Sequence, residues 1–146
     1  MVYLISACLL GEACRYDGKS KPIPPAIAAL AAEHTLIPVC PEVLGGLPTP
    51  RPPAERQGER IVTCEGGDVT DAYRRGAEEV LRLCRLHGAA GVILKNMSPS
   101  CGTRGIYDGS FTRTRTEGLG VTAALLLAEG IAILDEDGCA AGTEEK

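Results

Sequence analysis

The sequence is poor in aromatic residues: it has no tryptophan, one phenylalanine and an aromatic content of 3%. Aliphatic side chains must therefore fill the core, which suits a buried parallel sheet covered by helices. No apolar run approaches the length of about eighteen residues that a transmembrane helix needs, so no membrane span is expected. The first residues carry no basic leader and run straight into a strand-like segment, so we expect no secretory signal and a cytoplasmic protein.

The sequence also lacks an excess of basic residues. Fifteen lysines and arginines stand against nineteen acidic residues, which gives a formal net charge of −4. This balance disfavours non-specific binding to nucleic acid, although it does not exclude a small basic pocket. Histidine is scarce: His34 and His87 are the only two, and both are expected at helix ends. Histidine-rich zinc sites and Cys–His proteases are therefore disfavoured.

Cysteine, by contrast, is frequent, with seven residues in 146. An odd number and no sign of export argue against a disulfide framework. No C-x-x-C pair is present, which disfavours a zinc ribbon, a thioredoxin-like motif and a bacterial ferredoxin run. The thiols are therefore expected to be reduced, with some filling core space and others available for metal binding or catalysis.

Hydrophobic periodicity predicts strands and helices in alternation. We expect strands at 2–6, 35–39, 91–95 and 131–134, a short strand or hairpin arm at 60–64, and helices at 24–33, 69–87 and 119–129. This order is typical of a parallel sheet with right-handed crossovers. The predicted fold class is α/β: residues 1–146 form one domain, a three-layer sandwich with a mostly parallel, Rossmann-like sheet and a frayed tail from about residue 135.

Long loops are expected to follow three of these strands, and each loop region carries a cysteine. Cys8 lies two residues beyond the first strand, Cys40 directly follows the second, and Cys101 lies beyond the third. In open α/β sheets ligands bind at the carboxyl ends of the strands. Neighbouring strands are about 4.8 Å apart, so three remote thiols can meet on one metal centre with an open coordination position. The spacing alone does not choose between zinc and iron.

Other polar residues stand beside these cysteines. Glu42 follows Cys40 by two positions and is either a proton carrier beside a metal or an ordinary loop carboxylate or helix cap. Ser98 and Ser100 precede Cys101 and either bind substrate or satisfy a turn. Cys14 is open to three interpretations: a fourth ligand, a resolving thiol or a packing residue.

For four further residues a structural interpretation is favoured over a functional one. Arg51 lies in a long proline-rich loop, and the acidity of the chain favours a solvated loop charge over a phosphate or carboxylate grip. The pair Gly45–Gly46 would let backbone approach a ligand, but it is a weak signal. Cys84 falls on the apolar stripe of the middle helix and is expected in the core.

Several blocks of the sequence, in order, resemble the thiouracil desulfurase family. They are CLLGEACRYDG at 8–18, CPEVLGGLPTPR at 40–51, LKNMSPSCG at 94–102, YDG at 107–109 and GLGVT at 118–122. The resemblance implies a [4Fe–4S] cluster held by Cys8, Cys40 and Cys101, whose fourth iron binds the sulfur of a thiocarbonyl. It also implies a catalytic acid and a serine near the cluster, which fall on Glu42 and on Ser98, with Ser100 as the second choice.

The resemblance implies a non-redox, hydrolytic reaction. A small thiolated substrate such as 2-thiouracil or a related nucleobase would lose its sulfur as hydrosulfide, with Glu42 activating water. Two alternatives stay open on the residues alone: a zinc-dependent hydrolase or deaminase that uses the same thiols, and a non-catalytic iron–sulfur binding module. The sequence does not indicate the oligomeric state or the natural substrate: free thiouracil, a thiolated nucleoside and a thiolated tRNA base all stay open, and binding to nucleic acid is otherwise not expected.

Overall fold

The computed structural model describes residues 1–12, 17–18, 22–95, 105–107, 109–111 and 115–137. The elements in chain order are β1 (Val2–Ser6), the 3₁₀ helix η1 (Ala7–Leu10), α1 (Pro25–Glu33), β2 (Thr35–Val39), α2 (Pro41–Leu44), β3 (Ala54–Gln57), β4 (Arg60–Thr63), α3 (Thr70–His87), β5 (Gly91–Ile93), β6 (Gly105–Tyr107), β7 (Arg115–Glu117), α4 (Val121–Ala128) and β8 (Ile133–Leu134). None of the helices in these ranges is both long enough and apolar enough to cross a membrane.

The main sheet has the strand order β2-β1-β5-β8, and all its pairs are parallel. The N-terminal strand β1 therefore lies inside the sheet, with Ile5 opposite both Pro38 of β2 and Ile93 of β5. Pro38 lacks an amide donor, and a proline in a sheet belongs at an edge or at the end of a strand. Its strand β2 forms one edge of the sheet.

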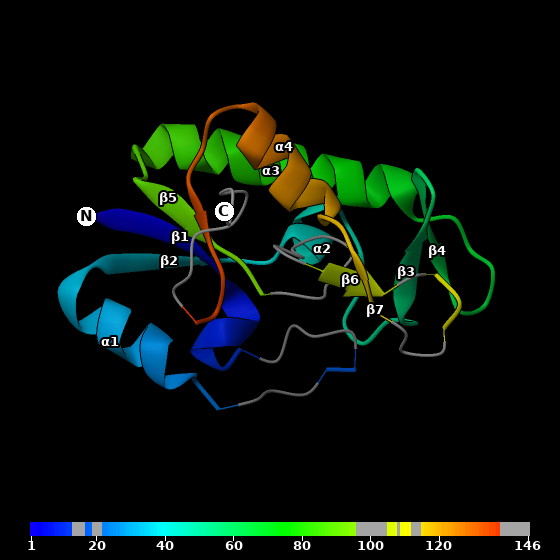
Figure 1. The fold of residues 1–146 in the computed structure, drawn as a ribbon, viewed down its shortest axis with the longest axis horizontal. Coiled ribbons are helices and arrows are strands. Elements are labelled where there is room, and N and C mark those ends of the chain that lie inside the picture. The colour runs from blue at the N-terminus through cyan, green and yellow to red at the C-terminus, as the bar shows by residue number, and fades with distance from the viewer. Residues whose placement is uncertain (13–16, 19–21, 96–104, 108, 112–114, 138–146) are drawn as a thin grey trace.

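Alternating residues of the strands pack on opposite faces of the sheet. Leu4 belongs to a buried cluster with residues of α3 and α4, whereas its neighbour Ile5 belongs to a second cluster with Ile27 of α1. Figure 1 shows α3 and α4 on one side of the sheet and α1 on the other. This arrangement confirms the predicted three layers, and its physical basis is the two-residue repeat of side-chain direction in a strand.

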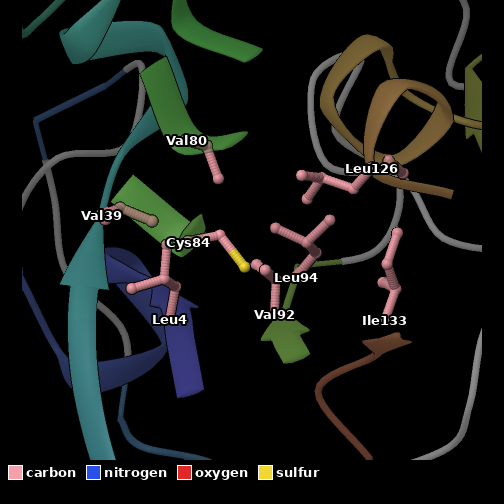
Figure 2. Close-up of a cluster of buried hydrophobic side chains, with 9 residues drawn as sticks. Leu4, Val39, Val80, Cys84, Val92, Leu94, Leu126 and Ile133 are labelled. Carbon is pink, nitrogen blue, oxygen red and sulfur yellow. The ribbon is translucent and has the colours of Figure 1, made fainter. Parts of the chain in front are cut away.

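The larger cluster lies between the sheet and the two helices α3 and α4. Figure 2 shows the sulfur of Cys84 pointing from α3 toward Val92 of β5, and the same cluster includes Leu4 of β1 and Val39 of β2. Cys84 is 2% exposed, and burial raises the pKa of its thiol. The prediction that Cys84 is a core residue is therefore confirmed. Helix α3 ends as predicted, because Gly88 adopts a left-handed conformation with φ of 60°.

Two regions that the sequence predicted as loops contain further elements. The predicted loop 41–58 holds α2 and β3, and β3 pairs with β4 in an antiparallel hairpin. The predicted loop 96–117 holds β6 and β7, which form a second antiparallel hairpin. These elements are short, and β3 reads Ala-Glu-Arg-Gln, which has no alternation of apolar and polar residues to reveal a strand.

Glu55 of β3 links the β3–β4 hairpin to residues 109–111, which follow β6. Its carboxylate is 8% exposed and accepts hydrogen bonds from the amides of Gly109 (3.0 Å) and Phe111 (3.1 Å). Phe111 has a φ of 60°, a conformation that a residue with a side chain seldom adopts. A charged acceptor thus satisfies two backbone donors at a strained turn.

The C-terminal segment was expected to fray from about residue 135. Asp135 is 4% exposed and accepts a hydrogen bond from the amide of Asp137, and Glu136 forms an ion pair with Lys95. Residues 138–146 of the expected tail lie outside the described residues.

Candidate functional site

The carboxyl ends of β2, β1 and β5 lie side by side at one edge of the sheet. Cys40 directly follows β2 and is the N-cap residue of α2, and Cys8 lies in η1, which directly follows β1. Neither cysteine is in a disulfide, and both side chains are partly buried. The two predicted ligands therefore follow neighbouring strands whose last residues, Ser6 and Val39, are register partners.

The third predicted ligand, Cys101, lies outside the described residues, as do Ser98, Ser100 and Cys14. The segment that leads to Cys101 leaves from the end of β5, beside β1. At that point the amide of Lys95 donates a hydrogen bond to the hydroxyl of Ser6 (3.1 Å), whose side chain is buried. Within the part of the chain that the structure describes, no three His, Cys, Asp or Glu residues group as metal ligands.

The donor chemistry of Cys8 and Cys40 fits a soft metal centre. Neither thiol is consumed in a disulfide, and neither is fully enclosed by core side chains. Thiolate ligands select zinc, copper(I) and iron–sulfur clusters over hard cations. The two described ligands therefore fit an iron–sulfur cluster, and by themselves they fit zinc equally well.

Glu42 is held by two hydrogen bonds from different parts of the chain. The Nε atom of Arg51 donates to its Oε2 atom at 3.0 Å, and the hydroxyl of Tyr73 donates to the same Oε2 atom at 2.9 Å. The side chains of Glu42 and Arg51 are 16% and 5% exposed. Glu42 lies in the first turn of α2, two residues beyond Cys40, so this carboxylate is fixed beside a predicted ligand.

The interpretation of Arg51 as a solvated loop charge is wrong. Its guanidinium is buried, pairs with Glu42, and also donates from Nη1 to the carbonyl of Pro48 (3.2 Å) and the hydroxyl of Thr49 (3.0 Å). Burial disfavours the charged guanidinium, but attraction to Glu42, with smaller contributions from Cys40 and Tyr73, outweighs burial and raises the pKa of Arg51. Arg51 therefore stays charged, close to the first turn of α2.

The position of α2 is set by backbone contact with α3. A Cβ atom added at Gly76 would lie 1.8 Å from the carbonyl oxygen of Pro41, and one added at Gly45 would lie 1.9 Å from that of Ala72. The side chain of Arg75 also donates to the carbonyl of Gly45 at 3.1 Å. Gly45 therefore allows close approach to a helix, and no ligand is needed to explain it.

The sequence suggests Glu42 as a candidate but does not indicate its two hydrogen-bond donors, Arg51 and Tyr73. Tyr73 follows the apolar stripe of α3, and its burial (2% exposed) reads as core packing. A buried tyrosine hydroxyl usually has a hydrogen-bond partner. A tyrosine among the apolar residues of a predicted helix therefore indicates a buried polar contact. For Arg51 no such signal exists, because a single arginine in a loop carries no mark of burial.

The sequence and the fold of this chain are similar to those of known proteins. A sequence model of the 2-thiouracil desulfurase family matches residues 3–138. YbbK, an uncharacterized protein of Bacillus subtilis strain 168, is 42% identical over 144 residues, which cover 92% of this chain and 95% of that protein. A solved structure described as the [4Fe-4S]-dependent thiouracil desulfidase TudS is 51% identical, with a TM-score of 0.86 over 92% of this chain and 90% of its own.

Proposed function

We propose a function from the premise that this chain belongs to the 2-thiouracil desulfurase family, which the match over residues 3–138 establishes. The protein is a desulfurase that depends on a [4Fe–4S] cluster and removes sulfur from thiouracil or a closely related thiolated base, as the similar solved enzyme does. The reaction is hydrolytic and non-redox: the thiocarbonyl becomes a carbonyl, and hydrosulfide is released. The family resemblance read from the sequence motifs is confirmed.

The cluster ligands in this proposal are Cys8, Cys40 and Cys101. Support comes from Cys8 and Cys40, which are not in disulfides and follow neighbouring strand ends, and from Lys95, the last described residue before Cys101, whose amide binds Ser6 at the end of β1. Held by these three residues, a bound cluster would supply a Lewis acid that polarises the thiocarbonyl of the substrate. Cys14 is not needed as a ligand.

Glu42 is the proposed general base, and the observation that carries this role is its fixed carboxylate two residues beyond Cys40. Glu42 takes a proton from water, and the water oxygen forms a bond to the carbon that bears sulfur. The carbon–sulfur bond then breaks with its electron pair on sulfur, and the proton can return to the departing fragment. Ser98 orients the heterocycle or the water, with Ser100 as the alternative.

The first test is anaerobic reconstitution followed by an assay of 2-thiouracil turnover. Hydrosulfide and uracil should appear in equal amounts without added reductant. Glu42→Gln should lose turnover and keep the cluster, whereas Glu79→Gln, which changes an exposed carboxylate on α3, should leave turnover unchanged. Full activity of Glu42→Gln would remove Glu42 from the mechanism, and a need for reductant would contradict the non-redox reaction.

The ligand assignment is tested by iron and acid-labile sulfide content. Single Ala substitutions at Cys8, Cys40 and Cys101 should each lower both contents, and Cys14→Ala should not. Cys64→Ala is the matched control, because Cys64 is an exposed thiol in the described part of the chain. A colourless wild-type protein that binds one zinc ion would contradict the cluster and favour the zinc hydrolase.

The proposal includes a small thiolated substrate and a location in the cytoplasm. A reducing compartment suits thiols that bind a cluster, and none of the described cysteines is in a disulfide. The net charge of −4 offers no general attraction to nucleic acid, so a free base or nucleoside is favoured over a thiolated tRNA.

A further inference from the structure

Arg51 and Tyr73 are buried polar side chains that the proposed reaction does not yet use. Both donate to Glu42, and both select its Oε2 atom, at 3.0 and 2.9 Å. Among the described residues, no hydrogen bond reaches the other carboxylate oxygen, Oε1. The two carboxylate oxygens of Glu42 therefore differ: Oε2 accepts two hydrogen bonds, and Oε1 accepts none from the described residues.

We propose that Arg51 and Tyr73 are positioning residues that fix the Glu42 carboxylate and assign proton transfer to Oε1. This inference rests on the proposed role of Glu42 as the base. An oxygen that already accepts two hydrogen bonds, one of them charge-assisted, has little capacity left to take a proton from water. Oε1 retains that capacity, so the proton moves to Oε1 while Oε2 stays bound to its two donors.

The two donors come from different elements, which fixes the carboxylate in more than one direction. Arg51 lies between α2 and β3, where its Nη1 atom holds the carbonyl of Pro48 and the hydroxyl of Thr49. Tyr73 lies on α3, the longest helix of the described residues, and is 2% exposed. Fixing a glutamate side chain costs conformational entropy. Because Arg51 and Tyr73 fix Glu42 before the reaction begins, this cost does not add to the activation free energy.

Tyr73→Phe is the cleaner probe, because it removes only a hydroxyl, whereas Arg51 also supports the loop at 48–49. We expect turnover number kcat for 2-thiouracil to fall about 10- to 100-fold in Tyr73→Phe and in Arg51→Lys, with KM changed less than about threefold. Iron and sulfide contents should equal those of the wild type. The matched controls are Tyr3→Phe and Arg82→Lys, which change an exposed hydroxyl contact and an exposed ion pair.

A binding measurement separates positioning from substrate contact. The dissociation constant of 2-thiouracil should be equal for the cluster-containing Glu42→Gln protein and for the Glu42→Gln, Tyr73→Phe double variant. Weaker binding by the double variant would show that Tyr73 touches the substrate, which overturns the positioning role. A fall in kcat that follows a matching loss of cluster in both Tyr73→Phe and Arg51→Lys would also overturn it.

The failures of the two proposals are distinguishable. If Glu42→Gln is fully active, the proposed general base is wrong, and the positioning role falls with it. If Glu42→Gln is inactive while Tyr73→Phe and Arg51→Lys turn over like the wild type, the base stands and the positioning role is wrong.

Discussion

Replacing Gly76 by alanine is expected to disturb stability and catalysis together. The new methyl group would lie 1.8 Å from the carbonyl oxygen of Pro41, 2.7 Å from its carbonyl carbon and 3.3 Å from its Cα atom. Real contacts of this kind are essentially never shorter than 3.0 Å, so α2 and α3 must separate by about 1.2 Å, the difference between the two values. Backbone atoms cannot rotate away from the contact as a flexible side chain would.

Two opposing effects determine how Gly76→Ala changes the free energy of unfolding. Helix propensity alone favours alanine over glycine by about 1 kcal/mol in a helix interior. Overpacking costs about 1–3 kcal/mol, and a contact between two backbones belongs at the upper end. We therefore expect the free energy of unfolding to fall by about 2 kcal/mol, measured by anaerobic urea denaturation. Glu78→Ala, at an exposed position of the same helix, is the control.

The same displacement should reach the site, because α2 carries Glu42. A shift of about 1.2 Å would stretch hydrogen bonds of 3.0 and 2.9 Å beyond useful length. Misplacement by about 1 Å can cost on the order of 100-fold in rate, so kcat should fall by that factor. A Gly76→Ala protein that is more stable than the wild type and fully active would refute the close packing of α2 on α3.

Three further predictions concern other buried groups. Ser6→Ala should lower the free energy of unfolding by about 1 kcal/mol in urea denaturation, because the partly buried amide of Lys95, just beyond β5, loses its acceptor; an unchanged value would contradict this hydrogen bond. Glu55→Ala should destabilise by about the same amount, and Glu55→Gln should restore much of the loss because its amide oxygen still accepts the two backbone donors. Cys64 should react with iodoacetamide at mildly basic pH, whereas Cys84, whose thiol pKa is raised by burial, should react only after unfolding; peptide mass spectrometry distinguishes the two thiols.

Secondary structure could be predicted from the sequence where burial requires a repeating pattern of apolar residues. The strands 2–6 and 35–39 and the helix ending at Gly88 were predicted with their observed ends, since apolar runs and glycine leave clear signals. The hairpins were missed because their short strands are held by cross-strand pairing and by polar contacts such as those of Glu55. Such contacts join residues about fifty positions apart and leave no local periodicity.

The candidate site shows the same division. Cys8, Cys40 and Glu42 were predicted because a parallel sheet brings strand ends together, and this rule needs only the order of the elements. The partners of Glu42 depend instead on how a loop and a helix pack around α2. That packing buries Arg51, whereas a charged residue in a loop sequence predicts exposure to solvent.

The inner position of the N-terminal strand has a consequence for biosynthesis. β1 leaves the ribosome before one of its two neighbours, β5, which begins at residue 91. At about 5–20 residues per second, several seconds separate the synthesis of these two strands. During that interval one side of β1 has no partner strand. Under the proposed ligand assignment, insertion of the cluster must also wait for Cys101, so until then the nascent protein has to keep both an open strand and the thiol of Cys8 from reacting elsewhere.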